Sequence, residues 1–215
     1  MGASVAIDFV YLYLKRNRGW PWPEDSWGLD SMFGRDGWCQ SCGTPLHEQT
    51  GPLTLQARGM SPVRGAWVPN WRFDVICLED SICDVVAKEF RVDLRRVEWR
   101  RSVQGGAMQV VAPTVGRNWF DPDELCQKAI LQHGTAGETC ASCGIWRWMP
   151  LAFGLTPPEL PALRPDEEWD EFDVVASPEW FGAGKRSFRQ VLVRRRLGEL
   201  IANSSPKDFK VSSVD

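Results

Sequence analysis

The chain has 215 residues, with 25 Lys and Arg against 28 Asp and Glu, and a formal net charge of -3. This length suffices for one large domain or two small ones with a buried core, and 43% hydrophobic residues are ordinary for a soluble globular protein. The acidic balance argues against broad, nonspecific nucleic-acid binding, because such binding depends on excess positive charge.

The first apolar stretch, Val5 to Leu14, alternates in a way that predicts a strand with at least one buried face. It is short, contains Asp8 and follows no basic residue, so it indicates neither a signal peptide nor a membrane span. We therefore expect a cytoplasmic protein without membrane contact. In that reducing compartment, the 7 cysteines favour metal binding over disulfides.

The middle of the chain predicts several strands and one helix. Aromatic and β-branched residues or apolar runs favour strands at 53–57, 71–78, 92–99 and 108–112. Residues 79–90 change to a helical period, with Asp80 or Ser81 as the cap. Cys77 and Cys83 lie in these apolar periodic stretches, so we interpret them as buried structural thiols and not as spare ligands.

A second helix has clear end signals. Asp121 can cap it, Pro122 suits its first position, and a Glu stands three residues after the cap. The helix is expected to run to His133 and to stop at Gly134. Cys126 lies within it and is expected to be packed, although its spacing leaves open that it replaces one of the metal ligands discussed below.

The C-terminal part begins after a Pro-rich stretch that predicts a linker. Residues 172–176 predict a strand, 188–201 trace a helical face, and 209–211 predict a returning strand, so the outline is β-α-β. The chain is thus divided into a metal-motif region, a linker and a C-terminal segment that together form one compact unit: residues 1–154, 155–165 and 166–215.

Two motifs, Cys39-Gln-Ser-Cys42-Gly and Cys140-Ala-Ser-Cys143-Gly, carry the strongest signal in the chain. In each motif two thiols can bind one metal ion, and the following glycine accepts the positive φ that turns backbone N–H groups toward the sulfurs. Two such motifs arise by chance in roughly one chain in several thousand of this composition. We predict that the four cysteines share one zinc ion.

Energetics permit the long loop that this shared site requires. Closing a loop as long as residues 43–139 costs about 4 kcal/mol, whereas a structural zinc ion contributes about 10 to 16 kcal/mol. Redox-active dithiols, disulfides or separate metal sites remain as alternatives. With four thiolate ligands the zinc site is closed, so its predicted role is structural.

The sequence offers little for catalysis. Its two histidines, His47 and His133, are far apart, and neither a G-x-S-x-G nor an H-E-x-x-H motif is present. Residues 182–187 are similar to a phosphate-binding loop, but the first glycine is too close and the lysine is followed by arginine, so we discount that site. We therefore predict a protein that is not an enzyme.

An acidic, aromatic stretch is the first candidate for partner contact. Six of the eight residues 166–173 are acids. A solvated face is the ordinary interpretation of such a run, but acids around an aromatic anchor can also occupy the basic cleft of a cationic partner. The residues predicted to make this contact are Glu167, Glu168, Trp169, Asp170 and Glu171.

Basic residues supply an alternative from another functional class. Arg194–Arg196, together with the pairs Arg95-Arg96 and Arg100-Arg101, would suit a zinc-ribbon module that binds nucleic acid or transcription machinery. The net negative charge makes nucleic acid the less favoured partner.

The two motifs and their placement resemble the bacterial double-CXXCG-motif family, regarded as immunity proteins. The first motif lies about forty residues into the chain and the second some seventy residues from its end. A closing strand-helix-strand pattern runs from Asp173-Val-Val through 188–192 to Asp208-Phe209. The family often has Pro after the first Cys, where this chain has Gln40. The resemblance implies a cytoplasmic protein that neutralises a cognate toxin by binding it.

These observations predict an α+β fold, with small mixed or antiparallel sheets and a few helices organised around a four-cysteine zinc-ribbon-like site. The predicted metal ligands are Cys39, Cys42, Cys140 and Cys143. The predicted function is that of a zinc-stabilised immunity protein whose partner is a protein toxin.

Overall fold

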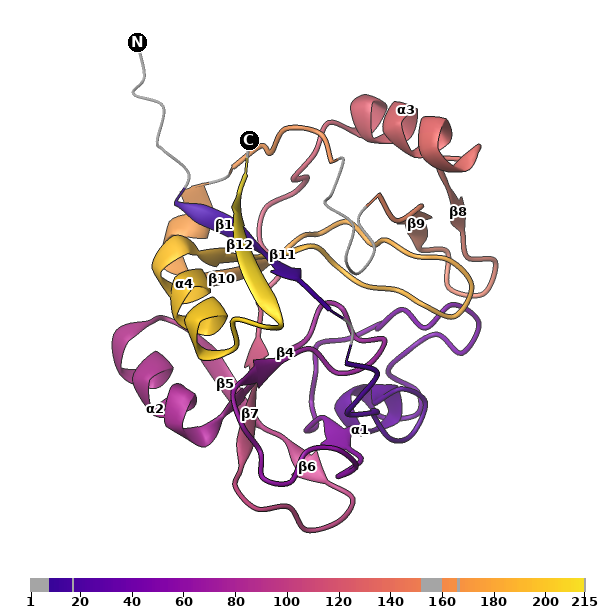
Figure 1. Cartoon of the computed structure of the whole chain (residues 1–215). Helices are drawn as coiled ribbons and strands as arrows, with labels where there is room; N and C mark the ends of the chain where they lie inside the picture. The colour runs from indigo at the N-terminus through magenta and orange to yellow at the C-terminus, as the bar shows by residue number, and fades with distance from the viewer. Residues whose placement is uncertain (1–7, 17, 152–159, 166, 215) are drawn as a thin grey trace.

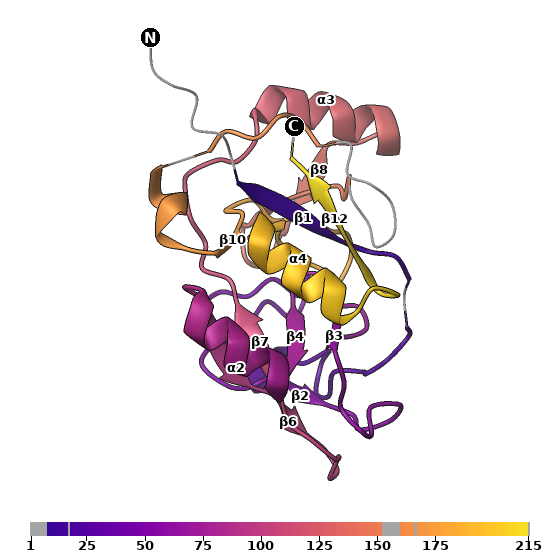
Figure 2. The same ribbon diagram turned by 60° about the vertical axis from the view of Figure 1, so that its left-hand side comes forward.

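The computed structural model describes residues 8–16, 18–151, 160–165 and 167–214. The predicted α+β class is confirmed: within these residues the chain forms four α-helices and several small sheets, nearly all antiparallel. Two four-stranded sheets and the helices on them form the body shown in Figures 1 and 2. None of the helices in these residues is long and apolar enough to cross a membrane.

The first four-stranded sheet joins the two ends of the chain. Its order is β10 (Val174–Ala176), β11 (Val191–Arg194), β1 (Phe9–Leu14) and β12 (Phe209–Ser213), with antiparallel neighbours. Figure 1 shows indigo β1 lying between strands of the orange and yellow C-terminal part. The strand predicted at the N-terminus is therefore a central strand, although residues 5–7 of that prediction lie outside the described residues.

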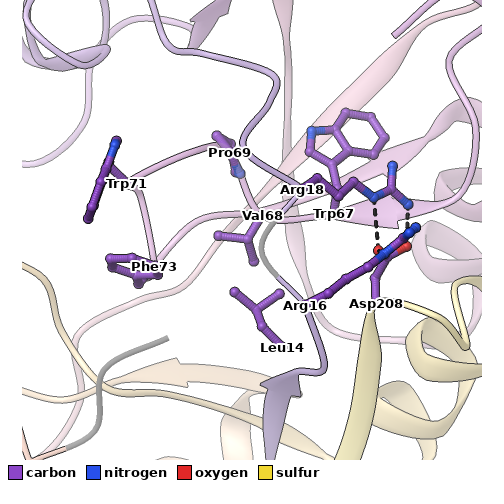
Figure 3. A pocket seen from close by; sticks show the side chains of 9 residues that line it. All are labelled: Leu14, Arg16, Arg18, Trp67, Val68, Pro69, Trp71, Phe73 and Asp208. Carbon is purple, nitrogen blue, oxygen red and sulfur yellow. Dashed lines mark hydrogen bonds and ion pairs between the residues drawn. The ribbon is translucent and has the colours of Figure 1, made fainter. Parts of the chain in front are cut away.

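Helix α4 (Arg195–Ser204) packs closely on this sheet. Gly198 makes that approach possible, because a Cβ at this position would lie 2.9 Å from Cγ2 of Val10. Just beyond the end of β1 and before the start of β12, Arg16 and Arg18 both donate to the buried carboxylate of Asp208 (Figure 3). Burial disfavours the ionised form of Asp208 and by itself would raise its pKa. The hydrogen bonds and positive charges of the two arginines outweigh burial, so the pKa of Asp208 is lowered.

The second four-stranded sheet comes from the middle of the chain. Its order is β3 (Ala66–Trp67), β4 (Ile76–Glu79), β7 (Ala107–Val111) and β5 (Asp93–Arg96), again antiparallel. Helix α2 (Asp80–Glu89) contacts β4 and β7 through its buried face. A single aliphatic core joins both sheets with α2 and α4, including Val10, Leu78, Val86, Val110 and Leu197.

Two other cores hold most of the buried aromatic side chains among the described residues. One lies beneath α3 (Pro122–His133) and the 3-10 helix η1 (Glu167–Glu171), and contains Trp119 and Trp169. The other surrounds Trp67 near α1 (Leu29–Phe33). Small two-stranded sheets complete the described elements: β2 (Thr54–Leu55) with β6 (Glu98–Trp99), and β8 (Gly137–Thr139) with β9 (Trp146–Trp148).

The predicted helix after residue 120 is confirmed in detail. The Asp121 side chain accepts from the backbone N–H groups of Asp123 and Glu124, and Gly134 adopts a φ of 76° where the helix ends. The helix predicted at 79–90 is also present, but the cap differs: Glu79 holds the N-cap position, without a side-chain cap bond.

Three predicted elements are corrected. The single strand predicted at 92–99 is divided into β5 and β6, which lie in different sheets. The strand predicted at 71–78 begins only at Ile76, because Trp71 has a φ of 66° and the chain turns there. The predicted helical face at 188–201 is part strand: β11 precedes α4, so this part is β-β-α-β and not β-α-β. Leu192 and Val193 face different cores, and a strand buried on both faces lacks the alternation that would have identified it.

The predicted linker lies partly outside the described residues, at 155–159. Of its described residues, Leu160 and Leu163 pack against the core that contains Trp169, and Arg164 N–H donates to the Trp119 carbonyl over 2.8 Å. Because β1 shares a sheet with β10, β11 and β12, the region before this stretch and the segment after it meet through backbone hydrogen bonds. The three-part division of the chain stays a prediction.

Candidate metal centre

The first CxxCG motif forms a tight knuckle between Trp38 and Pro45. The Cys39 N–H donates to the Thr44 carbonyl over 2.8 Å, and the Gly43 N–H donates to the Cys39 carbonyl over 2.7 Å. Gly43 has a φ of 74°, which costs a side-chain-bearing residue energy and glycine very little. The motif's own residues thus dictate its turn.

The second motif repeats this backbone. Cys140 N–H donates to the Ile145 carbonyl over 3.0 Å, Gly144 N–H donates to the Cys140 carbonyl over 2.8 Å, and Gly144 also has a φ of 74°. Strands β8 and β9 pair on either side of it, with Thr139 opposite Trp146. Each knuckle therefore presents its two sulfurs in the same local geometry.

The two knuckles face each other and bring all four sulfurs together. Cys39 Sγ lies 3.7 Å from Cys140 Sγ, Cys42 Sγ lies 3.7 Å from Cys143 Sγ, and all four sulfurs are within 4.8 Å of one another. A disulfide has an S–S distance of about 2.05 Å, so these are unbonded thiols. The cluster could hold one metal ion, as the sequence predicted for these four residues.

Electrostatics at the cluster are uneven. Backbone N–H groups of Cys143 and Ser142 point at the Cys140 sulfur and lower the pKa of that thiol to about 6. Burial raises the pKa of Cys143 to about 12 and also raises the pKa of Cys42. A cation would compensate the burial of four sulfurs and displace their protons, so this donor set fits a metal with affinity for thiolate.

Arg147 ties the two knuckles together. Its guanidinium, on β9 beside the second knuckle, donates to the Cys42 carbonyl over 3.1 Å and to the Gly184 carbonyl over 2.7 Å. The residue is only 2% exposed and forms an ion pair with Glu138. Nothing in the spacing of the sequence marked Arg147, because the carbonyls to which it donates lie far away along the chain.

A loop from the C-terminal part forms a wall against the first knuckle. Ser187 Oγ lies 2.7 Å from Thr44 Oγ1 and donates to the Cys42 carbonyl over 3.0 Å, while the Thr44 hydroxyl lies 3.2 Å from Cys42 Sγ. A Cβ on Gly43 would lie 2.5 Å from the Lys185 carbonyl oxygen. The glycine-rich stretch 182–187 thus packs against a cysteine knuckle.

The other three cysteines are not part of this cluster. Cys77 and Cys83 are buried, as predicted, and burial raises the pKa of both thiols, that of Cys83 to about 11. Cys126 is half-buried in α3. Among the described residues, the group of side chains that could hold a metal ion consists of the four motif cysteines and does not include Cys126. The observed grouping therefore favours the motif thiols over Cys126 as ligands.

The acidic stretch needs one correction. Trp169 was predicted to anchor a partner, but it is 2% exposed, and its ring centroid lies 4.6 Å from that of Trp119 in the aromatic core. Its large apolar ring therefore packs in the chain's own core and is not available to a partner. The neighbouring acids Glu168, Asp170 and Glu171 are exposed, whereas the Glu167 side chain lies outside the described set.

The arginines of the alternative prediction are largely engaged within the chain. Arg194 forms ion pairs with Asp170 and Asp173, and Arg196 forms one with Glu89. Arg95 donates to the Gln49 carbonyl over 2.6 Å. Much of the positive charge that a nucleic-acid surface would need is thus neutralised or buried by intramolecular contacts.

Comparisons of the chain with models of protein families, with curated proteins and with solved structures found no match. The interpretation of the cluster therefore rests on its atoms. Four convergent sulfurs on two matched knuckles, backed by a buried arginine, are the features of this molecule that indicate a defined chemistry.

Proposed function

We propose that the four cysteines bind one structural zinc ion. The observation that carries this proposal is the pair of 3.7 Å sulfur–sulfur distances across the knuckles. A tetrahedral zinc ion with Zn–S bonds of about 2.3 Å requires sulfurs about 3.8 Å apart. Thiolate ligands in tetrahedral geometry suit zinc or iron, so the metal's identity has to be measured.

Zinc content and ligation test this first step. The purified full chain should contain one zinc per molecule, and X-ray absorption should fit four sulfur ligands at about 2.3 Å. Visible absorption from iron–thiolate charge transfer, or a fit that needs nitrogen or oxygen ligands, would overturn the assignment. Measuring the metal content after growth with added zinc and, separately, with added iron shows whether the site prefers one metal or takes the one that is more available.

In this proposal, zinc acts as a clamp and carries out no reaction. Four protein thiolates leave no position for water or substrate on a tetrahedral ion. The clamp would join residues 39–43 to residues 140–144, and the loop 182–187 packs against the joined pair. A rigid surface assembled in this way is suited to binding, because a preorganised interface loses less entropy on association.

We further propose that the bound partner is a protein toxin and that the chain neutralises it by occlusion. The support is the resemblance of the two CxxCG motifs to the double-CXXCG-motif family, together with a closed metal site that suits a scaffold. Exposed acids at Glu168 and Glu171 supply a negative surface that could meet a cationic toxin, whereas the neighbouring Asp170 is already paired with Arg194. Trp169, being buried, has no part in this contact.

A genetic experiment tests the toxin proposal. Each gene next to the one encoding this chain is expressed in a bacterial host, alone and together with this protein. One neighbour should arrest growth, and co-expression should restore it, with the two proteins co-purifying as a complex. The proposal fails if no neighbour is toxic, or if the toxicity is the same with this chain present.

A charge-reversal variant then tests the contact surface separately. Replacing Glu168 and Glu171 by Lys should slow association with the toxin, most strongly at low salt, because electrostatic steering is screened by ions. A matched reversal of exposed acids on α3, at Asp123 and Glu124, should leave association unchanged. Equal rates for both variants would exclude the acidic stretch and leave the neutralising role intact.

A further inference from the structure

A cleft of about 700 Å³ lies where the two four-stranded sheets meet. Its lining includes the end of β7 and its exit, residues 110–114, one residue each from β10 and β11, and the stretch 45–49 that follows the first knuckle. Trp180 and Arg189 line it as well. The volume falls within the range of about 300 to 1,000 Å³ that holds small organic ligands.

The charged groups inside this cleft are mainly positive. Arg72 is 6% exposed, and Arg95 and Arg189 are half-buried. Among the described lining residues, Asp74 is the acid that shares their depth, whereas Glu48 and Asp93 are exposed to solvent. Inside the cleft, three guanidinium groups therefore face the Asp74 carboxylate, and Glu179 acts on Arg189 from outside the lining. The remaining excess of positive charge favours an anionic ligand.

One of these arginines has an unused donor. Within the described residues, neither Arg72 Nε nor Asp74 Oδ1 has a hydrogen-bond partner, although Arg72 Nη2 lies 3.4 Å from Asp74 Oδ1. The pair is thus close in space but poorly aligned. Arg72 Nε is buried, so a small turn of the guanidinium would bring it to the cleft; a ligand oxygen placed against it there would gain a charge-assisted hydrogen bond that the N–H now lacks.

The other two arginines are held in position. Arg95 Nη1 donates to the carbonyls of Gln49 and Gly51, over 2.6 Å and 3.2 Å. The Arg189 guanidinium stacks 4.1 Å from the centroid of Trp180. Side chains fixed in this way lose little entropy when a ligand binds. They provide a preformed positive field around the free donor of Arg72.

Part of the remaining lining is apolar and lies beside polar side chains such as Gln109 and Thr114. The lining includes Phe33, Leu46, Val75, Val110 and Trp180. We propose that the cleft binds a small organic acid with an apolar body: its carboxylate would accept from Arg72 Nε, and its body would lie against these walls. This binding site is independent of the zinc ion and of the proposed toxin contact.

Matched probes test this site on the full, metal-loaded chain. 4-Phenylbutanoate and its neutral isostere 4-phenylbutanamide are titrated into isotope-labelled protein, and the Arg72 Nε–H and Trp180 indole resonances are followed by NMR. The acid should bind saturably and shift both signals, with an affinity at least about tenfold higher than that of the amide. Equal affinities, or no saturable shift with either probe, would overturn the proposal.

Variants separate the donor from the cleft. Arg72→Gln should weaken acid binding about tenfold or more and remove the preference over the amide. Because Arg72 is buried, Thr114→Trp serves as a second variant: Thr114 is exposed at the cleft, and the larger ring should block both probes without disturbing the core. Arg101→Gln, an exposed arginine outside the lining, is the control and should bind like the wild type.

A peptide distinguishes a small-molecule site from a docking site for protein segments. Acetyl-Ala-Leu-Glu-Phe-Ala-amide carries the same carboxylate and phenyl groups on a backbone, and its Gln counterpart lacks the charge. Weaker binding of the Glu peptide than of 4-phenylbutanoate supports a small acid as the occupant. Tighter binding of the Glu peptide, lost in the Gln peptide and in Thr114→Trp, would overturn it in favour of a protein segment.

Discussion

The two cysteine knuckles have the same backbone but different surroundings. A Cβ on Gly43 would meet the Lys185 carbonyl at 2.5 Å, whereas among the described residues no atom beyond the adjacent ones lies within 4 Å of a Cβ on Gly144. Cys42 is 1% exposed, and Cys143 is only half-buried. The first knuckle is thus embedded in the protein and the second lies at its surface, so equal local sequence does not mean equal dependence on the rest of the fold.

Loss of a metal ligand should have the largest effect and should not distinguish the knuckles. Cys42→Ser and Cys143→Ser should each release the metal, because each removes one of four ligands. The chain should then lose most of its tertiary structure, since a structural zinc ion contributes about 10 to 16 kcal/mol and a whole domain is stable by about 5 to 15. Metal content and circular dichroism would measure this.

Cys126→Ser is the matched control for that pair. It removes a half-buried thiol outside the cluster and should retain one metal per chain with nearly unchanged stability. If the Cys143 variant kept its metal while the Cys126 variant lost it, the ligand set would be wrong.

Removing Arg147 should cause the next largest loss of stability, because this side chain connects the two knuckles. Arg147→Met removes the charged donor of two hydrogen bonds, one to the Gly184 carbonyl and one to the Cys42 carbonyl. Charged hydrogen bonds contribute about 1.5 to 3 kcal/mol each, so the loss of two should lower the free energy of unfolding, measured in urea, by about 3 to 6 kcal/mol.

The metal should remain bound in Arg147→Met, because all four sulfurs are still present. As a matched control, Arg117→Met removes an exposed arginine and should cost less than about 0.5 kcal/mol. An Arg147 variant as stable as this control would mean that the two knuckles do not depend on the guanidinium.

The paired glycine substitutions measure the difference between the knuckles directly. Alanine at a positive φ costs about 1 to 2 kcal/mol at either site. Gly43→Ala should cost a further 1 to 3 kcal/mol or so, because the added methyl group meets the Lys185 carbonyl. Thermal and urea unfolding of the two variants, both loaded with metal, would show this difference. Equal losses would contradict the buried position of the first knuckle.

The smallest expected effect compares two serine contacts. Ser187 Oγ is buried and bridges Thr44 and the Cys42 carbonyl, so Ser187→Ala should cost about 1 to 2 kcal/mol of unfolding free energy. Ser41 and Ser142 are exposed and share a 2.7 Å hydrogen bond between the knuckles, so Ser41→Ala should cost less than about 0.5 kcal/mol. If Ser41→Ala cost more unfolding free energy than Ser187→Ala, the exposed contact between the knuckles would be the more important one, and the packing of loop 182–187 against the first knuckle would matter less.

Local signals predicted the elements that depend on few residues. The end residues of α3 act through bonds within their own turn, and each CxxCG motif closes its own knuckle. The cluster of four sulfurs could be predicted because metal binding constrains residue type and spacing together. Where burial decided the conformation, prediction was weaker: β11 was taken for helix because a strand buried on both faces shows no alternation.

Trp169 shows the same limit at the level of function. Its sequence neighbourhood is acidic, which suggested a surface anchor, but Phe9 and Trp119 enclose its ring. Both contacts join residues far apart in the chain. An aromatic residue in the sequence is expected to be buried, but its sequence neighbours do not determine whether the chain's own core or another protein buries it.

The sequence by itself determined the two cysteine turns, the ends of α3 and the four sulfurs that converge, because each depends on bonds within a few residues or on a ligand chemistry with few solutions. Only the tertiary structure decided that one knuckle is embedded and the other exposed, that Arg147 and Ser187 support the site, and that three arginines line a cleft. The physical reason is that these contacts join distant segments, whose meeting depends on how the whole chain packs.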